Sequence, residues 1–427
     1  MLRFAPNNTQ DININNLRVA LFNYIISKQL NEPLLIRMDD IQNKTNKEAK
    51  QKQILEILNL FSIDHISTVY QSENIKQHHK MAMQLLMQKK AFSCFCTDEM
   101  IENSKQKAKK NNQPYIYDGG CDKLNDDVVM NTEAPFTVRI KAPIKKIEFT
   151  DLLKGKFEYA PHDIDSFIIL QKDKMPTYNF SCAIDDMLYD ISTVVRDEKY
   201  LDDTPKQIYI RESLGYTKPI NYLHIPAISN IDTDNNTSSI KWLIDEGFLP
   251  VAIANYLVLL GNNTPKEIFT LEDAIEWFDI KKLVQTEIKF DFEKLKDINK
   301  KHMMMLDNMR FSKLIGYADE DFGKLAKIYI DECSTLKEIK EKIDNILDTK
   351  ATPKELITEF EQIKKCLQSA PFIDDFTELK KYIIKQTSLD EKAVLKPLRY
   401  ILTKTYSGID LDKIYPLIKN YLGEIIR

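Results

Sequence analysis

The stretch "LRFAPNNTQDININNLRVALFNYIISKQLNEPLLIRMDD", residues 2–40, decides the fold. It predicts a short strand at 2–4, a loop, a helix of about 14 residues from Leu17 to Leu30, and an apolar strand at 33–40. Two strands joined through a helix are the start of a parallel α/β fold that binds a mononucleotide. The loop before the helix holds five asparagines and neither glycine nor histidine, although helix N-termini at this junction usually bind phosphate.

The composition is that of a large protein with several domains. The chain has 427 residues, of which 43% are hydrophobic, and this length favours about three domains. Its net charge of -4 means that a polyanion would have to meet local basic patches. No apolar run approaches about 18 residues, and the first residues lack the regions of a signal peptide, so we expect a cytoplasmic protein without a membrane anchor. Only 10 glycines occur where average usage gives roughly 30, which indicates that glycine-dependent backbone sites have been lost.

The pattern of the chain changes twice after this α/β start. Two amphipathic helices follow, and their apolar stripes at 54–61 and 81–86 favour core packing. From Phe92 to Leu170, short β-rich pieces, a lysine run and turns such as "YDGGC" indicate a subdomain inserted into the first fold. Beyond Pro226 almost all of the chain is predicted to be helical.

A set of segments in chain order now carries a family resemblance. They read "LRFAP", "LLIRMDD", "PTYNFSCAIDDMLYDISTVVR", "DTPKQIYI", "EGFLPVAIANYLVLLG", "FDFEKLKDIN" and "LKPLRYILTKTYSG". Their order and spacing resemble those of bacterial glutamyl-tRNA synthetases, and the resemblance covers essentially the whole chain. It implies a class I aminoacyl-tRNA synthetase fold, in a family that joins glutamate to ATP and passes the acyl group to a tRNA 3′ end.

The resemblance also implies a division into domains. A Rossmann-like catalytic domain is expected at 1–70 and 190–235. An acceptor-binding insertion at 71–189 splits it, carries a possible zinc site and returns to the sheet. A helical stem-contact domain is expected at 236–310, and a helical anticodon-binding domain at 311–427. The predicted fold class is therefore α/β plus all-α.

The first nucleotide motif of that family is altered here. It normally reads like "SPTG" followed by "HIGG" or "HIGN", whose histidine and helix N-terminus face the ATP phosphates while the glycine lets the adenine lie against the backbone. Here the two stretches read "NNTQ" at 7–10 and "NINN" at 13–16. Asn13 carries no positive charge, Asn15 puts a side chain where the base packs, and Asn16 matches a variable asparagine. We therefore predict that the phosphate-binding residues of the family have been replaced here and that the phosphate site is lost.

The second nucleotide motif is altered as well. It normally reads like "KLSKR", on a loop whose lysines meet the developing pyrophosphate charge. Counting back from the matched "EGFLP" places it at 230–234, which reads "NIDTD". Asn230 and Thr233 stand at the lysine positions, and two aspartates have entered, so ATP phosphates would meet carboxylates. The nearest lysine, Lys241, is expected on the next helix.

The amino-acid pocket is better preserved. By matching position, Arg3, Tyr178 and Arg196 correspond to residues that hold the carboxylate and ammonium ends of glutamate in the family. Asp39 stands where the family has a glutamate, so its contact to the ammonium would have a shorter reach. A guanidinium fork suits a carboxylate, and a phenol donates a hydrogen bond while excluding water. The alternative is that the two arginines only pair with nearby carboxylates such as those at 185–186.

A possible metal site is the other constellation that remains. Some glutamyl-tRNA synthetases carry zinc in the insertion, and Cys94-x-Cys96 followed by Tyr117-Asp-Gly-Gly-Cys121 stands at that spacing. Three thiolates and a phenolate oxygen complete a tetrahedral set, so the resemblance implies a structural zinc. The alternative is three unligated thiols.

The other cysteines and histidines are given no functional role. Cys182, Cys333 and Cys366 are expected to be core thiols. His78 and His79 lie on an amphipathic helix and are expected at its boundary with solvent rather than on a metal.

The candidate tRNA contacts lie in the matched C-terminal segment. They are Lys396, Arg399, Lys404 and Tyr406, because cations meet phosphates and an aromatic ring stacks on an unpaired base. The lysine run at 105–110 favours a solvated helix face over an acceptor-stem contact. The expected partner is tRNA, with glutamate as a possible ligand, no membrane and no protein partner that the sequence identifies.

Three functional hypotheses stay open. The first, slightly preferred, is a pseudoenzyme that keeps the synthetase fold and tRNA binding but has lost glutamylation. The second is a divergent but active glutamate–tRNA ligase, which would use ATP and Mg²⁺ and replace the lost cations with groups from elsewhere. The third is a decaying copy, consistent with low glycine and abundant lysine, asparagine and isoleucine. The apolar stripes of the predicted core helices and the spacing of the cysteines are still recognisable, which argues against decay.

Overall fold

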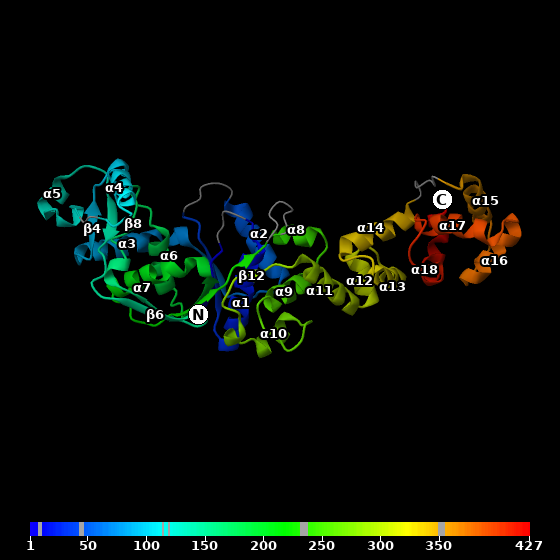
Figure 1. Cartoon of the computed structure of the whole chain (residues 1–427), viewed down its shortest axis with the longest axis horizontal. Helices are drawn as coiled ribbons and strands as arrows, with labels where there is room; N and C mark the ends of the chain where they lie inside the picture. The colour runs from blue at the N-terminus through cyan, green and yellow to red at the C-terminus, as the bar shows by residue number, and fades with distance from the viewer. Residues whose placement is uncertain (7–10, 42–46, 113–114, 118–119, 231–237, 349–354) are drawn as a thin grey trace. The chain divides into compact units, whose positions relative to one another are not determined.

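The chain forms two compact units in this computed structural model. The structure describes residues 1–6, 11–41, 47–112, 115–117, 120–230, 238–348 and 355–427. The first unit comprises 1–241 and 257–290, and the second comprises 242–256 and 291–427. The first is mixed α/β and the second is helical (Figure 1), which confirms the predicted fold class.

A seven-stranded sheet lies at the centre of the first unit, in the strand order β3-β2-β1-β9-β10-β6-β7. The pairs from β3 to β6 are parallel, and β6 pairs with β7 antiparallel. The strands are β1 (Leu2–Phe4), β2 (Leu34–Met38), β3 (Ser67–Tyr70), β6 (Ile147–Asp151), β7 (Gly155–Tyr159), β9 (Thr193–Asp197) and β10 (Asn221–Ile225). Because β1 has β2 on one side and β9 on the other, residues on these three strands can meet in one site.

The helix after β1 is longer than predicted. It runs over Ile14–Leu30 (α1) instead of beginning at Leu17. The side chain of Asn13 accepts a hydrogen bond from the backbone N–H of Asn16 at 3.0 Å, and the side chain of Asn16 accepts one from the N–H of Asn13 at 3.4 Å. This reciprocal cap contributes about 1 kcal/mol and starts the helix one turn early. The asparagines at this junction therefore have a local structural use.

A second, smaller sheet of the first unit is antiparallel. It comprises β4 (Ala91–Cys94), β5 (Thr137–Ile140) and β8 (Ile168–Leu170). Its apolar face shares a core with α3 (Ile75–Met87), α6 (Tyr178–Leu188) and α7 (Thr204–Ser213). Strands β6 and β7 fall within the predicted insertion at 71–189 and yet pair in the main sheet. The division into four domains stays a prediction.

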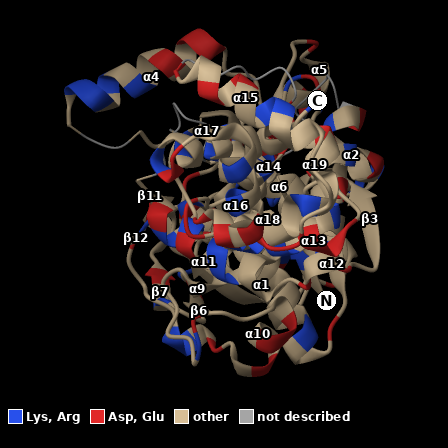
Figure 2. Ribbon diagram, turned by 90° about the vertical axis from the view of Figure 1, so that its right-hand side faces the viewer, with Lys and Arg blue, Asp and Glu red and all other residues tan. Residues whose placement is uncertain are grey.

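The remaining elements of the first unit are short or lie around these sheets. They are α2 (Lys47–Leu60), η1 (Gln71–Asn74), α4 (Asp98–Lys110), η2 (Gly120–Lys123), α5 (Asp126–Asn131), η3 (Pro161–Asp163), η4 (Glu198–Asp203), α10 (Leu271–Trp277), η5 (Ile280–Lys282) and the parallel pair β11 (Ile228–Ser229) with β12 (Ile288–Lys289). In α4, acidic residues occupy the first turn and lysines the last, which complements the helix dipole. Figure 2 shows this separation of charge along α4, and its described side chains are exposed or half-buried.

The second unit is built from amphipathic helices. Parts of α8 (Ile240–Asp245) and α9 (Pro250–Leu259) belong to this unit. Its other helices are α11 (Phe292–Met305), α12 (Asn308–Leu314), α13 (Glu320–Tyr329), α14 (Leu336–Leu347), α15 (Ile357–Gln368), α16 (Phe376–Thr387), α17 (Glu391–Thr403), α18 (Leu411–Ile418), η6 (Lys419–Tyr421) and α19 (Leu422–Ile425). In α14, Ile339, Ile343 and Ile346 recur at helical spacing and are fully buried. Among the described helices of the whole chain, none has the length and hydropathy needed to span a bilayer.

The close approach of α12 to α13 at Gly323 predicts a stability defect. A Cβ on Gly323 of α13 would lie 1.8 Å from the carbonyl oxygen of Asn308 in α12. We expect Gly323→Ala to lower the free energy of unfolding by about 1–3 kcal/mol, because the two helices must move apart. Urea unfolding followed by circular dichroism measures it.

The matched control is Gly423→Ala in α19, where a Cβ meets no atom within 4 Å. This change should be neutral or stabilise by up to about 1 kcal/mol, since alanine favours a helix over glycine. Equal unfolding midpoints for the two variants would contradict the packing account.

Candidate functional site

A buried ion cluster joins the sheet to α6. The Nε of Arg3 lies 3.0 Å from Oδ1 of Asp186, and the Nη1 of Arg37 lies 2.8 Å from the same oxygen. These three residues are at most 4% exposed. Burial by itself raises the pKa of a carboxyl, but the two guanidinium groups keep the pKa of Asp186 below its ordinary value. The cluster therefore remains ionised and ties β1, β2 and α6 together.

Asp39 and Cys182 extend this cluster towards the predicted pocket. The Nε of Arg37 lies 2.7 Å from Oδ1 of Asp39, and its Nη2 lies 3.0 Å from Sγ of Cys182. Burial raises the pKa of Cys182 to about 12, so its thiol stays protonated. Arg37 and Cys182 were not among the predicted pocket residues. A charged side chain in the apolar strand "LLIRM" was the available signal for Arg37, because a buried charge requires a partner.

The neighbouring carboxylate, Asp185, has its own set of partners. Its oxygens lie 2.8 Å from Nε2 of His78, 2.9 Å from Nε2 of Gln71 and 3.0 Å from Nδ2 of Asn74. His78 is buried, with an exposure of 0%, and the following His79 is half-buried, so the pair straddles the solvent boundary of α3 as expected. The buried carboxylate supplies the polar partner that lets the imidazole enter the core.

Arg196 of β9 is buried without an ion pair to any carboxylate of the described residues. Its Nε donates to Nε2 of His224 at 3.1 Å, and its Nη1 donates to Oε1 of Gln207 at 3.0 Å. Its Nη2 donates to the carbonyl of Tyr200 at 3.1 Å and to Oγ1 of Thr204 at 2.7 Å. Burial lowers the pKa of Arg196. The pairing considered as an alternative from the sequence is thus present for Arg3, with Asp186, and absent for Arg196.

The fold brings the four predicted glutamate-site residues into one electrostatic neighbourhood. Tyr178, at the start of α6, has a pKa raised by burial, while the nearby charges of Arg196 and Asp39 act on it in opposite directions. The charge of Arg3 acts to lower the pKa of Asp39. The carboxylate that acts most strongly on the pKa of Arg3 itself is Asp186. One arginine of the set therefore has its charge neutralised by the protein, and one does not.

The start of α1 is closed by its own side chains and by a second segment. The Oδ1 of Asn15 accepts a hydrogen bond from the N–H of Ile228 at 3.0 Å, and the N–H of Ile14 donates to the carbonyl of Ser238 at 3.0 Å. The nearest arginine in the chain, Arg18, donates to the main-chain carbonyls of Pro226 and Leu260. These groups are engaged with the protein rather than directed to a phosphate.

The second predicted nucleotide motif is only partly described. Asn230 lies in the left-handed region, with a φ of 57°, which asparagine tolerates better than most residues. Thr233 lies outside the described residues, as do 7–10 of the first motif.

The predicted metal ligands lie together in the first unit. The hydroxyl of Tyr117 lies 3.5 Å from Sγ of Cys94 and 3.7 Å from Sγ of Cys96, and Sγ of Cys96 lies 3.6 Å from Sγ of Cys121. A tetrahedral Zn²⁺ site with bonds of about 2.3 Å has sulfur–sulfur edges of about 3.8 Å. The three sulfurs lie within 4.8 Å of one another, so the donor set fits a metal of this kind.

The ionisable groups of this cluster differ in pKa: burial raises the pKa of Cys96 to about 12 and raises the pKa of Tyr117 above its ordinary value, whereas the pKa of Cys94 is lowered. Burial by itself raises the pKa of Cys94, but the hydroxyl of Tyr117, the backbone of Cys96 and the side chain of Arg139 together lower it to about 7. Arg139 lies over the ring of Tyr117 at 4.3 Å. A cation beside the cluster favours thiolate, which is the form that binds metal.

The predicted tRNA residues of the second unit divide into two groups. Lys396, Arg399 and Tyr406 line one open hollow of about 370 Å³. Lys396 lies 5.2 Å above the ring of Tyr406 and pairs with Glu355 at 3.0 Å. Lys404 is not among its lining residues, and its ammonium donates to two main-chain carbonyls. Burial lowers the pKa of Lys404 to about 8.

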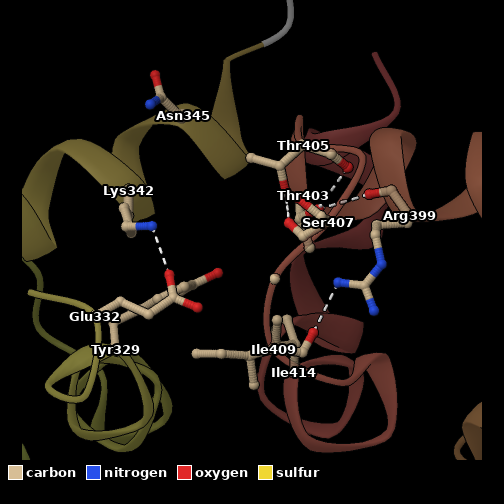
Figure 3. A pocket seen from close by; sticks show the side chains of 11 residues that line it. Tyr329, Glu332, Lys342, Asn345, Arg399, Thr403, Thr405, Ser407, Ile409 and Ile414 are labelled. Atoms are coloured by element: carbon tan, nitrogen blue, oxygen red, sulfur yellow. Dashed lines mark hydrogen bonds and ion pairs between the residues drawn. The ribbon is translucent and has the colours of Figure 1, made fainter.

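Arg399 also lines a smaller cavity of about 50 Å³ between α13, α14 and the segment after α17. Figure 3 shows its guanidinium donating to the carbonyl of Ile409, at 2.8 Å, while the hydroxyl group of Thr403 lies 3.0 Å from that of Thr405 and donates to the main-chain carbonyl of Arg399. On the other wall, Lys342 of α14 is paired with a carboxylate. Arg399 is therefore the one predicted residue that faces both hollows in the described part of the second unit.

The architecture of the first unit is that of a class I aminoacyl-tRNA synthetase: a parallel sheet opened by β1, α1 and β2, a small antiparallel sheet after β3, and a buried group of charged side chains from β1, β2, β9 and α6. Residues 1–297 match the family of class I tRNA synthetases (E and Q), catalytic domain. The chain belongs to the glutamyl-tRNA synthetase family.

Relatives in that family match the chain over its whole length. It is 48% identical to "Glutamate--tRNA ligase 2" of Sulfurimonas denitrificans and 46% identical to "Glutamate--tRNA ligase 1" of Nitratiruptor sp., and each alignment covers 100% of both chains. The solved structure of a glutamate tRNA ligase from Elizabethkingia meningosepticum is similar in fold, with a TM-score of 0.81 at 20% identity over 100% of this chain and 98% of that chain.

The buried cluster predicts a pH-dependent loss of stability. We expect Asp186→Asn to lower the free energy of unfolding at pH 7 by about 3–5 kcal/mol, because Arg3 and Arg37 lose their shared carboxylate. Since the pKa of Asp186 is lower in the folded state, its contribution is present above the ordinary pKa and is lost as the pH falls through the folded value. The difference between wild type and variant should therefore shrink below about pH 4.

Urea unfolding at pH 7, 5 and 3 measures this dependence. Asp190→Asn is the matched control, because that carboxylate lies on the surface and pairs with the exposed Lys218. Its effect should be too small to resolve. A pH-independent difference for Asp186→Asn would show that packing rather than charge stabilises the cluster.

Proposed function

We propose that this protein binds tRNA and keeps a glutamate pocket, while ATP-dependent glutamylation is lost or severely weakened. The observation that carries the proposal is the start of α1. There the side chain of Asn13 accepts a hydrogen bond from the backbone N–H of Asn16 at 3.0 Å. In nucleotide-binding folds, N–H groups at this position of a helix bind phosphate. The N–H of Ile14 is taken by the carbonyl of Ser238. An ATP phosphate would have to displace these bonds, and Arg18, the nearest arginine along the described chain, is already bonded to main-chain carbonyls.

The missing lysines of the second motif add to this effect. By analogy with the removal of one transition-state donor, each loss costs about 3 kcal/mol, or roughly 100-fold in rate. Such losses are rarely additive, but several together predict a very slow enzyme. The two aspartates that replace neutral or basic positions at 230–234 would repel the triphosphate.

Retention of glutamate binding is supported by the charge balance of the pocket. Arg196 is 5% exposed and makes hydrogen bonds only to neutral acceptors of the described residues. A buried cation without a counter-ion is costly, and a ligand carboxylate would lower that cost. Tyr178 lies beside it with a protonated hydroxyl group, since burial raises its pKa.

Binding of tRNA is supported by the hollow that Lys396, Arg399 and Tyr406 share. A guanidinium and an ammonium group can meet phosphates there, and the ring of Tyr406 offers a face for a base. Asp410 and Asp412 also line the hollow, so phosphates would have to lie on its Lys396 and Arg399 side. Lys404 is a weaker candidate, because its ammonium is already bonded to two carbonyls.

A second candidate function is a divergent, active glutamate–tRNA ligase. The names of the curated relatives and their full-length match favour it. In that case ATP and Mg²⁺ would be bound by groups other than the two altered motifs.

Glutamate-dependent exchange of pyrophosphate into ATP, measured with tRNA present, separates the two functions. We expect the wild type to stay at the level of a blank without tRNA. Exchange at a rate near that of ordinary synthetases would overturn the proposal and establish the second candidate.

The combined variant Asn13→His, Asn15→Gly, Asn230→Lys and Thr233→Lys should regain measurable exchange, because it restores two lysines, one imidazole and an open backbone. A variant with only Asn230→Lys and Thr233→Lys is the control, and it should remain near the blank.

We further propose a structural zinc held by Cys94, Cys96, Cys121 and the phenolate of Tyr117. Elemental analysis of the purified chain should find about one zinc per chain. Cys96→Ser and Cys121→Ser should each remove it, whereas Cys366→Ser, at a cysteine of α15 remote in sequence, should leave it in place. Full reaction of the three thiols with a thiol reagent in untreated protein would contradict the proposal.

A further inference from the structure

We propose that Asp151 and His224 position Arg196 for a ligand carboxylate and so determine the preference of the pocket for a carboxylate over an amide. This inference rests on the proposed retention of glutamate binding. Asp151 ends β6, Arg196 lies in β9, and His224 lies in β10, which is between these two strands in the sheet, so three strands contribute to one chain of hydrogen bonds. The three residues are at most 5% exposed.

Asp151 fixes the tautomer of His224. Its Oδ2 accepts hydrogen bonds from the main-chain N–H of His224 at 2.9 Å and from Nδ1 of the same residue at 2.8 Å. Its Oδ1 accepts from the N–H groups of Leu153 and Lys154 at 2.9 and 2.8 Å. An ionised carboxylate only accepts, so Nδ1 must carry the proton and Nε2 must be free to accept. Burial also lowers the pKa of His224, which favours the neutral ring.

His224 in turn orients Arg196 without neutralising it. Its Nε2 accepts from Nε of Arg196 at 3.1 Å and lies 3.0 Å from Oγ1 of Thr204. A guanidinium has five N–H donors. The bonds to His224, Gln207, Thr204 and the carbonyl of Tyr200 use four of them, which leaves one N–H on Nη1. The position of the group is thus set by neutral acceptors, and its full charge remains for a ligand.

This arrangement discriminates between ligands by charge. A carboxylate gains a charge-assisted hydrogen bond from the remaining N–H, whereas an amide gains only a weaker one. A carboxylate at position 224 would form an ion pair with Arg196 and remove that difference. The wrong tautomer of His224 would point an N–H at the Nε–H of Arg196 and turn the guanidinium away.

Isothermal titration of the full chain with glutamate and with glutamine tests the proposal. Asp151→Asn should weaken glutamate binding by about 10-fold or more, because the amide no longer holds the proton on Nδ1. His224→Glu should weaken it by about 100-fold and abolish the preference for glutamate over glutamine. His224→Gln places an amide oxygen near Nε2, so it should keep binding within about 5-fold of wild type. His302→Gln is the control, since His302 is a buried histidine bonded to Asn255 in the second unit.

Two further measurements keep the outcomes distinct. Histidine ¹⁵N spectra should show the Nδ1–H tautomer of His224 in wild type and the Nε2–H tautomer in Asp151→Asn, without any ligand. If His224→Glu does not fold, the double variant Asp151→Asn with His224→Gln replaces it and should bind no worse than His224→Gln alone, because no imidazole proton remains to be misplaced.

Unchanged tautomers, or wild-type affinity together with a wild-type preference in Asp151→Asn, would overturn the positioning role. A wild type that binds no glutamate at millimolar concentration, with the expected tautomers in the spectra, would instead refute the retained glutamate pocket and with it the role in selectivity.

Discussion

The ion cluster of Arg3, Arg37 and Asp186 is the constraint on which the rest of the pocket depends. Two guanidinium groups share one carboxylate oxygen at 3.0 and 2.8 Å in the interior. Removing such charges from water is costly, and the attraction between them offsets that cost only when the geometry is close and the remaining donors are satisfied. Asp39 and the sulfur of Cys182 take the further donors of Arg37. Strands β1 and β2 are therefore tied to α6 in one relative position.

The first unit offers different hydrogen-bonding groups to its two expected ligands, glutamate and ATP. At the predicted glutamate site, Arg196 makes hydrogen bonds to neutral acceptors and has no ion pair among the described residues. At the start of α1, the backbone N–H groups are already bonded to Asn13 and to Ser238. A carboxylate ligand would find a cation without a counter-ion, and a triphosphate would find donors in use. This contrast gives the proposed function its physical basis, since polar groups that are already satisfied gain little from a ligand.

Much of the fold could be predicted because local patterns report secondary structure. The strand at 2–4, the apolar strand after the first helix and the helical C-terminal part follow from periodicity alone. The start of α1 was placed too late, because asparagine is a poor helix former and its capping role depends on a partner three residues away. The amphipathic pattern placed His78 and His79 across the solvent boundary of their helix, but the partner that holds the buried His78, Asp185, became visible only in the structure.

The sequence by itself determined the family and the cysteine spacing and predicted altered nucleotide motifs, because each of these depends on contiguous or regularly spaced residues. The tertiary structure decided which buried cations pair with a carboxylate and which are held by neutral acceptors. Arg3 meets Asp186 across 183 positions of the chain, and Arg37 meets it across 149. No local pattern encodes such a pairing, because it is the packing of the sheet against α6 that brings the partners together and excludes water from them.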